Sequence, residues 1–186
     1  MEGNTRRGEL LIAGVGGWGI VTIGNILADA ALAEYENVAW FPSYATMMRG
    51  GDSECCIIFS HDRISSPVIY TSSAVMVLGA TRIAAFKDRV KPDGMMLIET
   101  SGVNDDNRVD SDNVDVRYIS AIEEAKRLGS IKNANLVMLG AYIGTTGLVS
   151  KESILDIIAT RFGGEGKEKI VASCSEAFQA GLALAN

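Results

Sequence analysis

The sequence predicts an α/β protein with three layers (α/β/α), in which helices cover both faces of a mostly parallel, Rossmann-like sheet. Short runs that are apolar on both faces alternate along the chain with segments whose apolar residues recur at helical spacing. A glycine cluster between the first such run and the first helical segment is typical of a strand–turn–helix unit. The chain has 186 residues, of which 47% are hydrophobic. We therefore expect one domain over residues 1–186, with a flexible N-terminus at 1–8 and a surface loop at 103–113.

The first half of the chain contains most of the expected strands. Residues 10–13 form the first strand, and from Ile20 onward apolar residues recur with the period of a helix. Residues 38–41 form a second strand that Pro42 ends, and a long connection at 43–51 follows it. The pattern then predicts strands at 54–60, 74–78 and 95–98, a short edge strand at 67–70, a helix at 81–90 and a turn at 92–94.

The second half becomes helical after one more strand at 114–119. Ser120 and Glu123 match the Ser-x-x-Glu capping box and begin a helix that ends near Gly129. Two terminal helices each carry an apolar stripe, formed by Ile154, Ile158 and Phe162 in one and by Val171, Cys174, Phe178 and Leu182 in the other. The Asp- and Asn-rich segment 103–113 favours a solvated loop.

Charge and cysteine content argue against several classes of protein. The formal net charge is −6 and no basic stripe occurs, so a nucleic-acid partner is not expected. The apolar stretch at 136–144 is shorter than the roughly 20 residues of a membrane span, and residues 1–8 lead into too few apolar residues for a signal peptide. We expect a cytoplasmic protein. Cys55 and Cys56 are adjacent and Cys174 is distant, a spacing that favours neither an iron–sulfur cluster nor another metal site.

No residue pattern predicts a catalytic group in this chain. The only histidine, His61, lies at an expected hairpin turn and has no patterned Ser or Cys nucleophile around it. A Ser-His-Asp type of site is therefore not supported, and a solvated turn histidine is the simpler interpretation.

The glycine cluster Gly14-Val15-Gly16-Gly17-Trp18-Gly19 matches the Gly-x-Gly-x-x-Gly motif between a strand and a helix. In that context backbone N–H groups and a helix N-terminus hold a phosphate. The second strand, however, ends in Trp40-Phe41-Pro42 and lacks the acid that binds a ribose in dinucleotide folds. A tight turn without a ligand, an anion or nucleotide site, and a dinucleotide fold all remain open.

The connection at residues 43–51 follows the second strand, at the end of the sheet where open α/β proteins place their ligands. Arg49 offers a planar fork for a phosphate or carboxylate, and Gly50-Gly51 allow a partner to approach the backbone closely. A surface arginine beside a flexible bend is the alternative interpretation.

Several segments, taken together and in order, resemble the gamma subunit of 2-oxoacid:ferredoxin oxidoreductases, the family of the pyruvate, 2-oxoglutarate and 2-oxoisovalerate enzymes. They are Gly14–Gly19, Ser43-Tyr44 with Arg49-Gly50-Gly51, Ile64–Pro67, Pro92–Gly94 and Asn135–Ala141. Their order and spacing match across residues 10–183. The resemblance implies a subunit, inactive in isolation, of a complex that oxidatively decarboxylates a 2-oxoacid to an acyl-CoA and reduces ferredoxin.

The same resemblance implies the partners and cofactors of that complex. Thiamine diphosphate and Mg are expected on alpha and beta subunits, and iron–sulfur clusters on the beta subunit or on a ferredoxin-like delta subunit. This chain would hold no cofactor of its own and would pack near coenzyme A. As candidates for contacts to coenzyme A phosphates or to partner subunits, the resemblance carries over Gly14, Gly16, Gly17, Gly19, Tyr44, Arg49, Gly50, Gly51 and Asn135.

The chain also departs from the family pattern. Trp18 stands where the family usually has Gln, and Met47 where it usually has Glu. Because Trp18, Met47 and Met48 lie in expected loops, they predict an exposed apolar contact surface.

Two alternative functions remain: a stand-alone nucleotide-binding Rossmann-like protein, and the beta subunit of an indolepyruvate-type oxidoreductase. Binding of NAD, FAD or S-adenosylmethionine to the isolated chain would favour the first. His-Gly and Gln before the Arg-Gly-Gly segment would favour the indolepyruvate-type subunit, but this chain has Met47 and Met48 before Arg49, which disfavours it.

Overall fold

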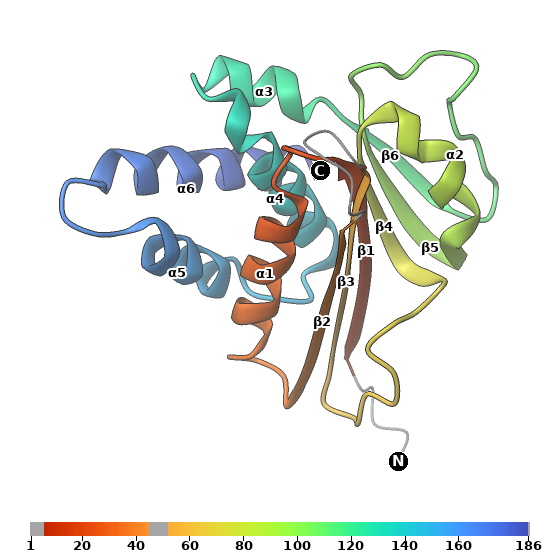
Figure 1. Ribbon diagram of the computed structural model, residues 1–186, viewed down its shortest axis with the longest axis horizontal. Helices are drawn as coiled ribbons and strands as arrows, with labels where there is room; N and C mark the ends of the chain where they lie inside the picture. Colours follow the sequence, from red (N-terminus) through yellow and green to blue (C-terminus); the bar gives the residue numbers. More distant parts are fainter. Residues whose placement is uncertain (1–5, 45–51, 186) are drawn as a thin grey trace.

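The computed structural model describes residues 6–44 and 52–185, and in this part of the chain six strands form one sheet (Figure 1). The strands are β1 (Arg7–Val15), β2 (Asn37–Tyr44), β3 (Asp52–Ser60), β4 (Ser72–Leu78), β5 (Val90–Glu99) and β6 (Asp115–Ile119), in the spatial order β2-β3-β1-β4-β5-β6. β1, β4, β5 and β6 run parallel, whereas β3 is antiparallel to both β1 and β2. The mostly parallel sheet thus carries an antiparallel pair at one edge.

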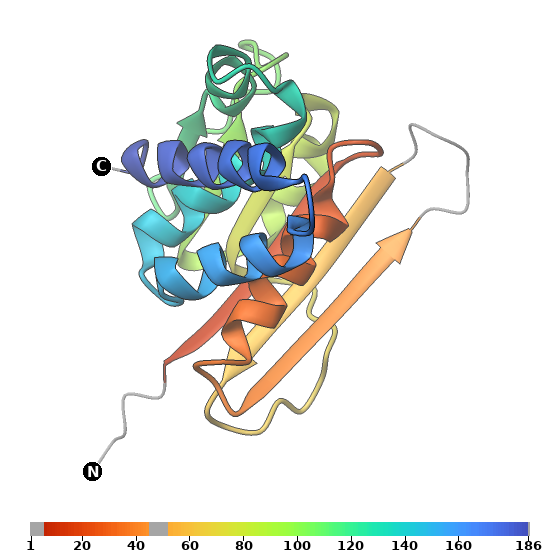
Figure 2. The same cartoon turned by 90° about the vertical axis from the view of Figure 1, so that its left-hand side faces the viewer.

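Helices cover the two faces of the sheet unequally (Figures 1 and 2). They are α1 (Ile20–Ala31), α2 (Ile83–Phe86), α3 (Ala121–Arg127), α4 (Ala134–Thr146), α5 (Lys151–Phe162) and α6 (Glu168–Ala183). On one face α1 and α4 lie against the strands, and α5 and α6 pack on them from outside. The other face carries α2 and irregular segments. The predicted three-layer α/β class is confirmed.

Alternation along the strands divides the core into two clusters, one on each face of the sheet. Leu10 and Ile12 of β1 belong to the cluster beneath α1 and α4, whereas Leu11 and Ala13 belong to the cluster on the α2 side. Cys55 and Cys56 are buried in opposite clusters for the same reason. Burial raises the pKa of the Cys55 thiol to about 12, so this thiol stays protonated and unreactive at neutral pH.

Strand β2 shows that the prediction for Pro42 was wrong. Pro42 pairs with Cys55 inside the ladder, and the strand continues to Tyr44. β2 is the edge strand of the sheet, where the missing N–H of proline can face away from the ladder. At the start of the chain, β1 begins at Arg7, within the segment expected to be flexible, because Arg7 and Gly8 pair with β3.

Two further elements differ from the expectation in the middle of the chain. The helix expected at 81–90 is α-helical only in α2, between 3₁₀ turns at Ala80–Arg82 and Lys87–Arg89. It ends at Arg89 because Val90 already pairs with Ser72 in the sheet. No strand forms at 67–70. There Ser66 Oγ donates a hydrogen bond to the Val68 carbonyl and accepts one from the Val68 N–H, and Arg89 Nε donates to the Tyr70 carbonyl. These backbone groups therefore bond to side chains and not to a neighbouring strand.

The turn expected at residues 92–94 is instead an irregularity inside β5. The register with β4 shifts between the pairs Ser72–Val90 and Ala74–Met95, which places the extra residues in β5. Asp93 adopts a left-handed backbone with φ of 61°. The loop at 103–113 contains no helix or strand, and most of its residues are exposed.

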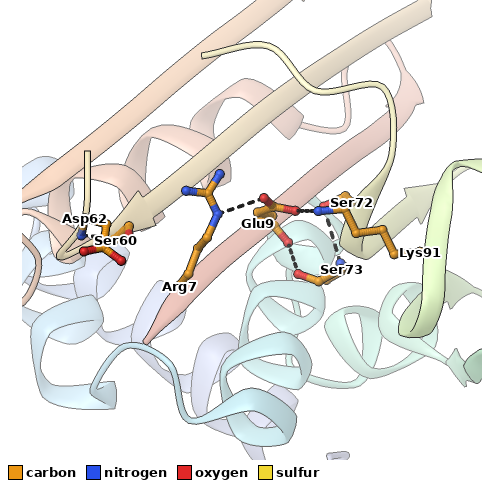
Figure 3. A network of polar contacts seen from close by, with 8 residues as sticks. Arg7, Glu9, Ser60, Asp62, Ser72, Ser73 and Lys91 are labelled. Carbon is orange, nitrogen blue, oxygen red and sulfur yellow. Dashed lines mark hydrogen bonds and ion pairs between the residues drawn. The ribbon is translucent and has the colours of Figure 1, made fainter. Parts of the chain in front are cut away.

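A buried carboxylate joins β1 to β5 near the amino end of β1 (Figure 3). Glu9 accepts hydrogen bonds from Arg7 Nε (2.9 Å) and Lys91 Nζ, and its backbone carbonyl accepts one from Ser73 Oγ. Burial by itself raises the pKa of Glu9, but the hydrogen bonds and positive charges of Lys91 and Arg7 outweigh burial. They hold the pKa below its ordinary value of 4.5.

This lowered pKa predicts a loss of stability in acid. A folded-state pKa below the unfolded one contributes stability that is present above about pH 4.5 and is lost as the pH falls through the folded value. Glu9→Gln should therefore lower the free energy of unfolding at pH 7 by about 1.5 kcal/mol, and this difference from wild type should shrink at pH 3. Urea unfolding at both pH values measures it, with the exposed Glu123→Gln as the control. A difference that is the same at both pH values would contradict the prediction.

Candidate functional site

The glycine turn between β1 and α1 needs glycine at several positions. Gly17 and Gly19 have φ values of 103° and 67°, in the left-handed region that strains other residues. Gly14 lies so close to β4 that an added Cβ would be 2.5 Å from the carbonyl oxygen of Leu78. The turn therefore lets the chain leave β1 sharply and enter α1, and only Val15 and Trp18 carry side chains between Gly14 and Gly19.

A hollow of about 300 Å³ lies beside this turn. It is lined by Val15, Gly16, Gly17, Gly19, Ile20, Val21 and Ser53. None of these residues is charged, and the first turn of α1 contains no acidic residue. The N–H groups of a first helical turn lack partners within the helix and lie at the positive end of its dipole. The geometry is thus suited to a phosphate or another anion.

Asn135 joins the glycine turn to the start of α4. Its side chain is buried, with 7% exposed, and its Nδ2 donates a hydrogen bond to the carbonyl of Gly19 (3.2 Å). Its Oδ1 accepts a hydrogen bond from the backbone N–H of Leu136 (2.9 Å). A Cβ on Gly19 would lie 2.4 Å from Asn135 Nδ2. Asn135 therefore holds the two helix N-termini together and is a positioning residue.

The structure brings part of the predicted site together. Gly14, Gly16, Gly17, Gly19 and Asn135 lie at one end of the sheet, although Asn135 is far from the glycines in sequence. The backbone of Tyr44 ends β2 and pairs with Ser53, which lines the hollow.

The remaining predicted positions are not placed beside the turn by the structure. Arg49, Gly50 and Gly51, together with Met47 and Met48, lie outside the described residues. Trp18 is half-buried and packs on the core, so it does not form the exposed apolar surface predicted for it.

A second cavity, of about 130 Å³, was not predicted from the sequence. It is lined by Trp18, Leu78, Gly79, Glu99, Ser101, Ile122 and Ala134. It lies at the carboxyl ends of β4 and β5, where open α/β sheets bind ligands. The only signal in the sequence is Glu99, an acid at the end of an otherwise apolar run.

Glu99 is a buried hydrogen-bond acceptor in this cavity. Only 2% of it is exposed, and its carboxylate accepts hydrogen bonds from Ser101 N (2.8 Å), Ser101 Oγ (3.3 Å) and Ile122 N (3.3 Å). Ser120 precedes α3 as predicted, but the capping-box bond is not made, because Glu99 bonds the first turn of α3 instead. Because the Glu99 oxygens are hydrogen-bond acceptors, this cavity is less suitable for an anionic ligand than the hollow beside the glycine turn.

The other side chains considered for chemistry do not form a site. His61 is exposed and stacks on Tyr35, with their ring centroids 5.0 Å apart. Across residues 6–44 and 52–185, His, Cys, Asp and Glu side chains nowhere gather in the groups of three or more that a metal ion needs. In the same part of the chain, every helix is too short or too polar to span a membrane.

Comparisons with known proteins agree on one family. A family model described as "Pyruvate ferredoxin/flavodoxin oxidoreductase" matches residues 9–184. "Ketoisovalerate oxidoreductase subunit VorA" of Methanothermobacter marburgensis is 33% identical over 168 residues, which cover 89% of this chain and 34% of that protein. "2-oxoglutarate synthase subunit KorC" of Methanocaldococcus jannaschii is 30% identical over 177 residues, covering 93% of each chain. The chain thus spans about a third of VorA and nearly all of KorC.

The solved structures include a match of similar extent. The keto/oxoacid ferredoxin oxidoreductase gamma subunit of Geobacter sulfurreducens superimposes with a TM-score of 0.79 at 28% identity, covering 96% of both chains. Sequence and fold therefore agree over almost the same residues.

Proposed function

The chain belongs to the pyruvate ferredoxin/flavodoxin oxidoreductase family, and on that premise we propose that it is the gamma subunit of a 2-oxoacid:ferredoxin oxidoreductase complex. The observation that carries this proposal is the match to KorC, which covers nearly the full length of both chains. The complex would convert a 2-oxoacid and coenzyme A to an acyl-CoA and carbon dioxide, with the electrons passing to ferredoxin.

In this proposal the redox cofactors belong to partner subunits. Alpha and beta subunits would bind thiamine diphosphate with Mg, and the beta subunit or a ferredoxin-like delta subunit would bind the iron–sulfur clusters. The thiols of this chain do not suit a cluster, because Cys55 and Cys56 are buried on opposite faces and Cys174 is buried in α6. The isolated chain would therefore be inactive, and the complex would work in the cytoplasm.

The glycine turn is the proposed point of contact with coenzyme A or with a partner subunit. The uncharged hollow of about 300 Å³ and the N-terminus of α1 fit a phosphate group. Asn135 would keep the turn rigid, and Tyr44, Arg49, Gly50 and Gly51 are proposed to extend the same contact. The substrate pocket is proposed to lie on the partner subunits, which would then determine which 2-oxoacid is used.

Affinity purification of the tagged chain from its native host, without oxygen and at low salt, tests the proposal. We expect alpha and beta subunits to co-purify, identified by mass spectrometry, together with reduction of methyl viologen that depends on a 2-oxoacid and coenzyme A. Repeated recovery of the chain alone, with micromolar binding of NAD, FAD or S-adenosylmethionine by calorimetry, would favour the stand-alone nucleotide-binding alternative.

Substitution of Gly19 tests the role of the turn itself. Gly19→Ala introduces a strained left-handed alanine and places its Cβ 2.4 Å from Asn135 Nδ2, so we expect the KM for coenzyme A to rise about tenfold or the yield of co-purified partners to fall. Arg49→Ala should act in the same direction. The matched control is Gly129→Ala, because Gly129 also has a positive φ (86°) but a Cβ there would meet nothing within 4 Å. Equal effects of the two glycine substitutions would argue against a specific role for the turn.

A further inference from the structure

Strand β2 is the outer strand of the sheet, and its free edge is uncharged (Figure 2). Within the part of the chain that the structure describes, no strand lies beside β2 on the side away from β3. Proteins commonly protect such an edge with charged residues, bulges or proline. β2 has no charged side chain, pairs with β3 without a bulge and contains only Pro42 from this set. The edge is therefore open to a further strand.

The backbone groups on this edge are free to bond to another strand. In an antiparallel ladder, successive residues point their N–H and C=O groups alternately toward the neighbouring strand and away from it. Pro42 has no N–H and stays in register with Cys55, so its backbone groups point away from β3. By the same alternation, the N–H and C=O groups of Val38 and Trp40 also point away. These three residues present two donors and three acceptors to a further strand.

A groove of about 480 Å³ lies along the first half of this edge. It is lined by Leu32, Glu36, Asn37, Val38, Ala39, Arg63, Ile64 and Pro67. Val38 and Ala39 point to opposite faces of the sheet, so the groove extends across the edge of the strand. Glu36 and Arg63 carry opposite charges, and the groove has no formal net charge. It therefore does not repel a second copy of this chain, although the whole chain has a net charge of −6.

Phe41 is an exposed aromatic side chain on the same strand. It is 46% exposed and pairs in register with Cys56, whose side chain lies on the α2 side of the sheet. Ala39, which lines the groove, lies on that same side two residues earlier. In a two-fold contact, each copy supplies the same surface to the other. An exposed apolar side chain and a groove on one strand edge therefore fit a second copy of this chain.

We propose that two copies of this chain pair through β2, antiparallel about a two-fold axis at Trp40. The Trp40 N–H of each copy donates to the Trp40 carbonyl of the other, and the Val38 N–H donates to the Pro42 carbonyl. Phe41 lies opposite Ala39 of the second copy and enters its groove. The missing N–H of Pro42 faces the Val38 carbonyl, so the proline removes one hydrogen bond on each side and leaves the others intact. The two sheets then form one continuous sheet.

The mass of the full chain in solution tests this proposal. Sedimentation equilibrium at about 1 to 500 µM should show a reversible change from one chain to two. Phe41→Lys places a charge in the contact and should weaken the association at least about tenfold. The matched control is Ile170→Lys, which puts the same charge at a similarly exposed apolar position of α6 (50%) and should leave the association unchanged. A chain that stays single at all concentrations, or equal association of the two variants, would overturn the proposal.

Hydrogen exchange shows whether β2 makes the contact. In a single chain the amides of Val38 and Trp40 face solvent, whereas those of Ala39 and Phe41 bond to β3. We expect exchange at Val38 and Trp40 to slow at least about tenfold from low to high protein concentration, with Ala39 and Phe41 protected at both. If the chain dimerises while the Val38 and Trp40 amides exchange as fast as in the single chain, another surface makes the dimer and the proposal is wrong.

The same exchange measurement on the purified complex separates a second copy from a partner subunit. Slow exchange at Val38 and Trp40 in the complex, from a chain that stays single on its own, would assign the edge to a partner subunit and overturn the proposal. Because the first two measurements use this chain alone, their outcome is independent of the proposed subunit function.

Discussion

Gly181→Ala should destabilise the protein by about 2 kcal/mol, although alanine favours helices more than glycine does. Gly181 lies where α6 crosses α4. A Cβ at this position would be 2.0 Å from the carbonyl oxygen of Val137, and a Cβ on Gly140 of α4 would be 2.1 Å from the carbonyl oxygen of Phe178. Both obstacles are backbone atoms, so the added methyl group fits only if the two helices separate.

The sign of the stability change depends on whether the helix propensity of alanine outweighs the cost of the added methyl group in the helix crossing. Alanine gains about 1 kcal/mol over glycine in a helix interior. Because the obstacles are backbone atoms, the cost of forcing the helices apart is at the upper end of the usual range of about 1–3 kcal/mol, which leaves a net loss of about 2 kcal/mol. Separation of the helices would also loosen the buried Phe178 and Cys174. Urea unfolding measures the change. The control is Gln179→Ala, an exposed position two residues earlier in α6, which should alter stability by less than about 0.5 kcal/mol. A stabilised Gly181→Ala would contradict the close crossing.

The elements of the fold were predictable where local periodicity determines them. The stripe containing Cys174 and Phe178 predicted α6, and apolar runs predicted β1, β3, β4 and β6 near their observed positions. Periodicity does not give the order of strands in a sheet. Pro42 was therefore expected to end β2, since only the strand order shows that β2 is an edge strand. The close contact between Gly140 and Gly181 likewise depends on a crossing between distant segments.

The candidate site was predictable only in part, for the same reason. Gly-x-Gly-x-x-Gly located the turn, and the family resemblance added Asn135. Neither indicated that the Asn135 amide donates to Gly19. Asp93 was expected in an ordinary turn, whereas it lies where the register between β4 and β5 shifts.

Glu99→Ala should lower the free energy of unfolding by about 3 kcal/mol. The substitution leaves the N–H groups of Ser101 and Ile122 without their buried acceptor. Each unpaired N–H group costs about 1–3 kcal/mol, and a water molecule that enters and bonds to it reduces this cost. It also enlarges the cavity of about 130 Å³ next to Trp18, which adds a packing cost. The matched control is Glu123→Ala, which removes an exposed carboxylate from the first turn of α3 and should cost about 0.5 kcal/mol.

Glu99→Gln makes this prediction sharper, because it keeps the side-chain volume and one acceptor oxygen. Oε1 accepts from Ile122 N, and Oε2 accepts from Ser101 N, so an amide can satisfy only one of the two N–H groups. The loss of stability should therefore increase in the order Glu123→Ala, Glu99→Gln, Glu99→Ala. Hydrogen exchange should become faster at the Ser101 and Ile122 amides in Glu99→Ala. If Glu99→Ala costs no more than Glu123→Ala, the carboxylate does not stabilise the start of α3, and the carboxyl ends of β4 and β5 are held by apolar packing alone.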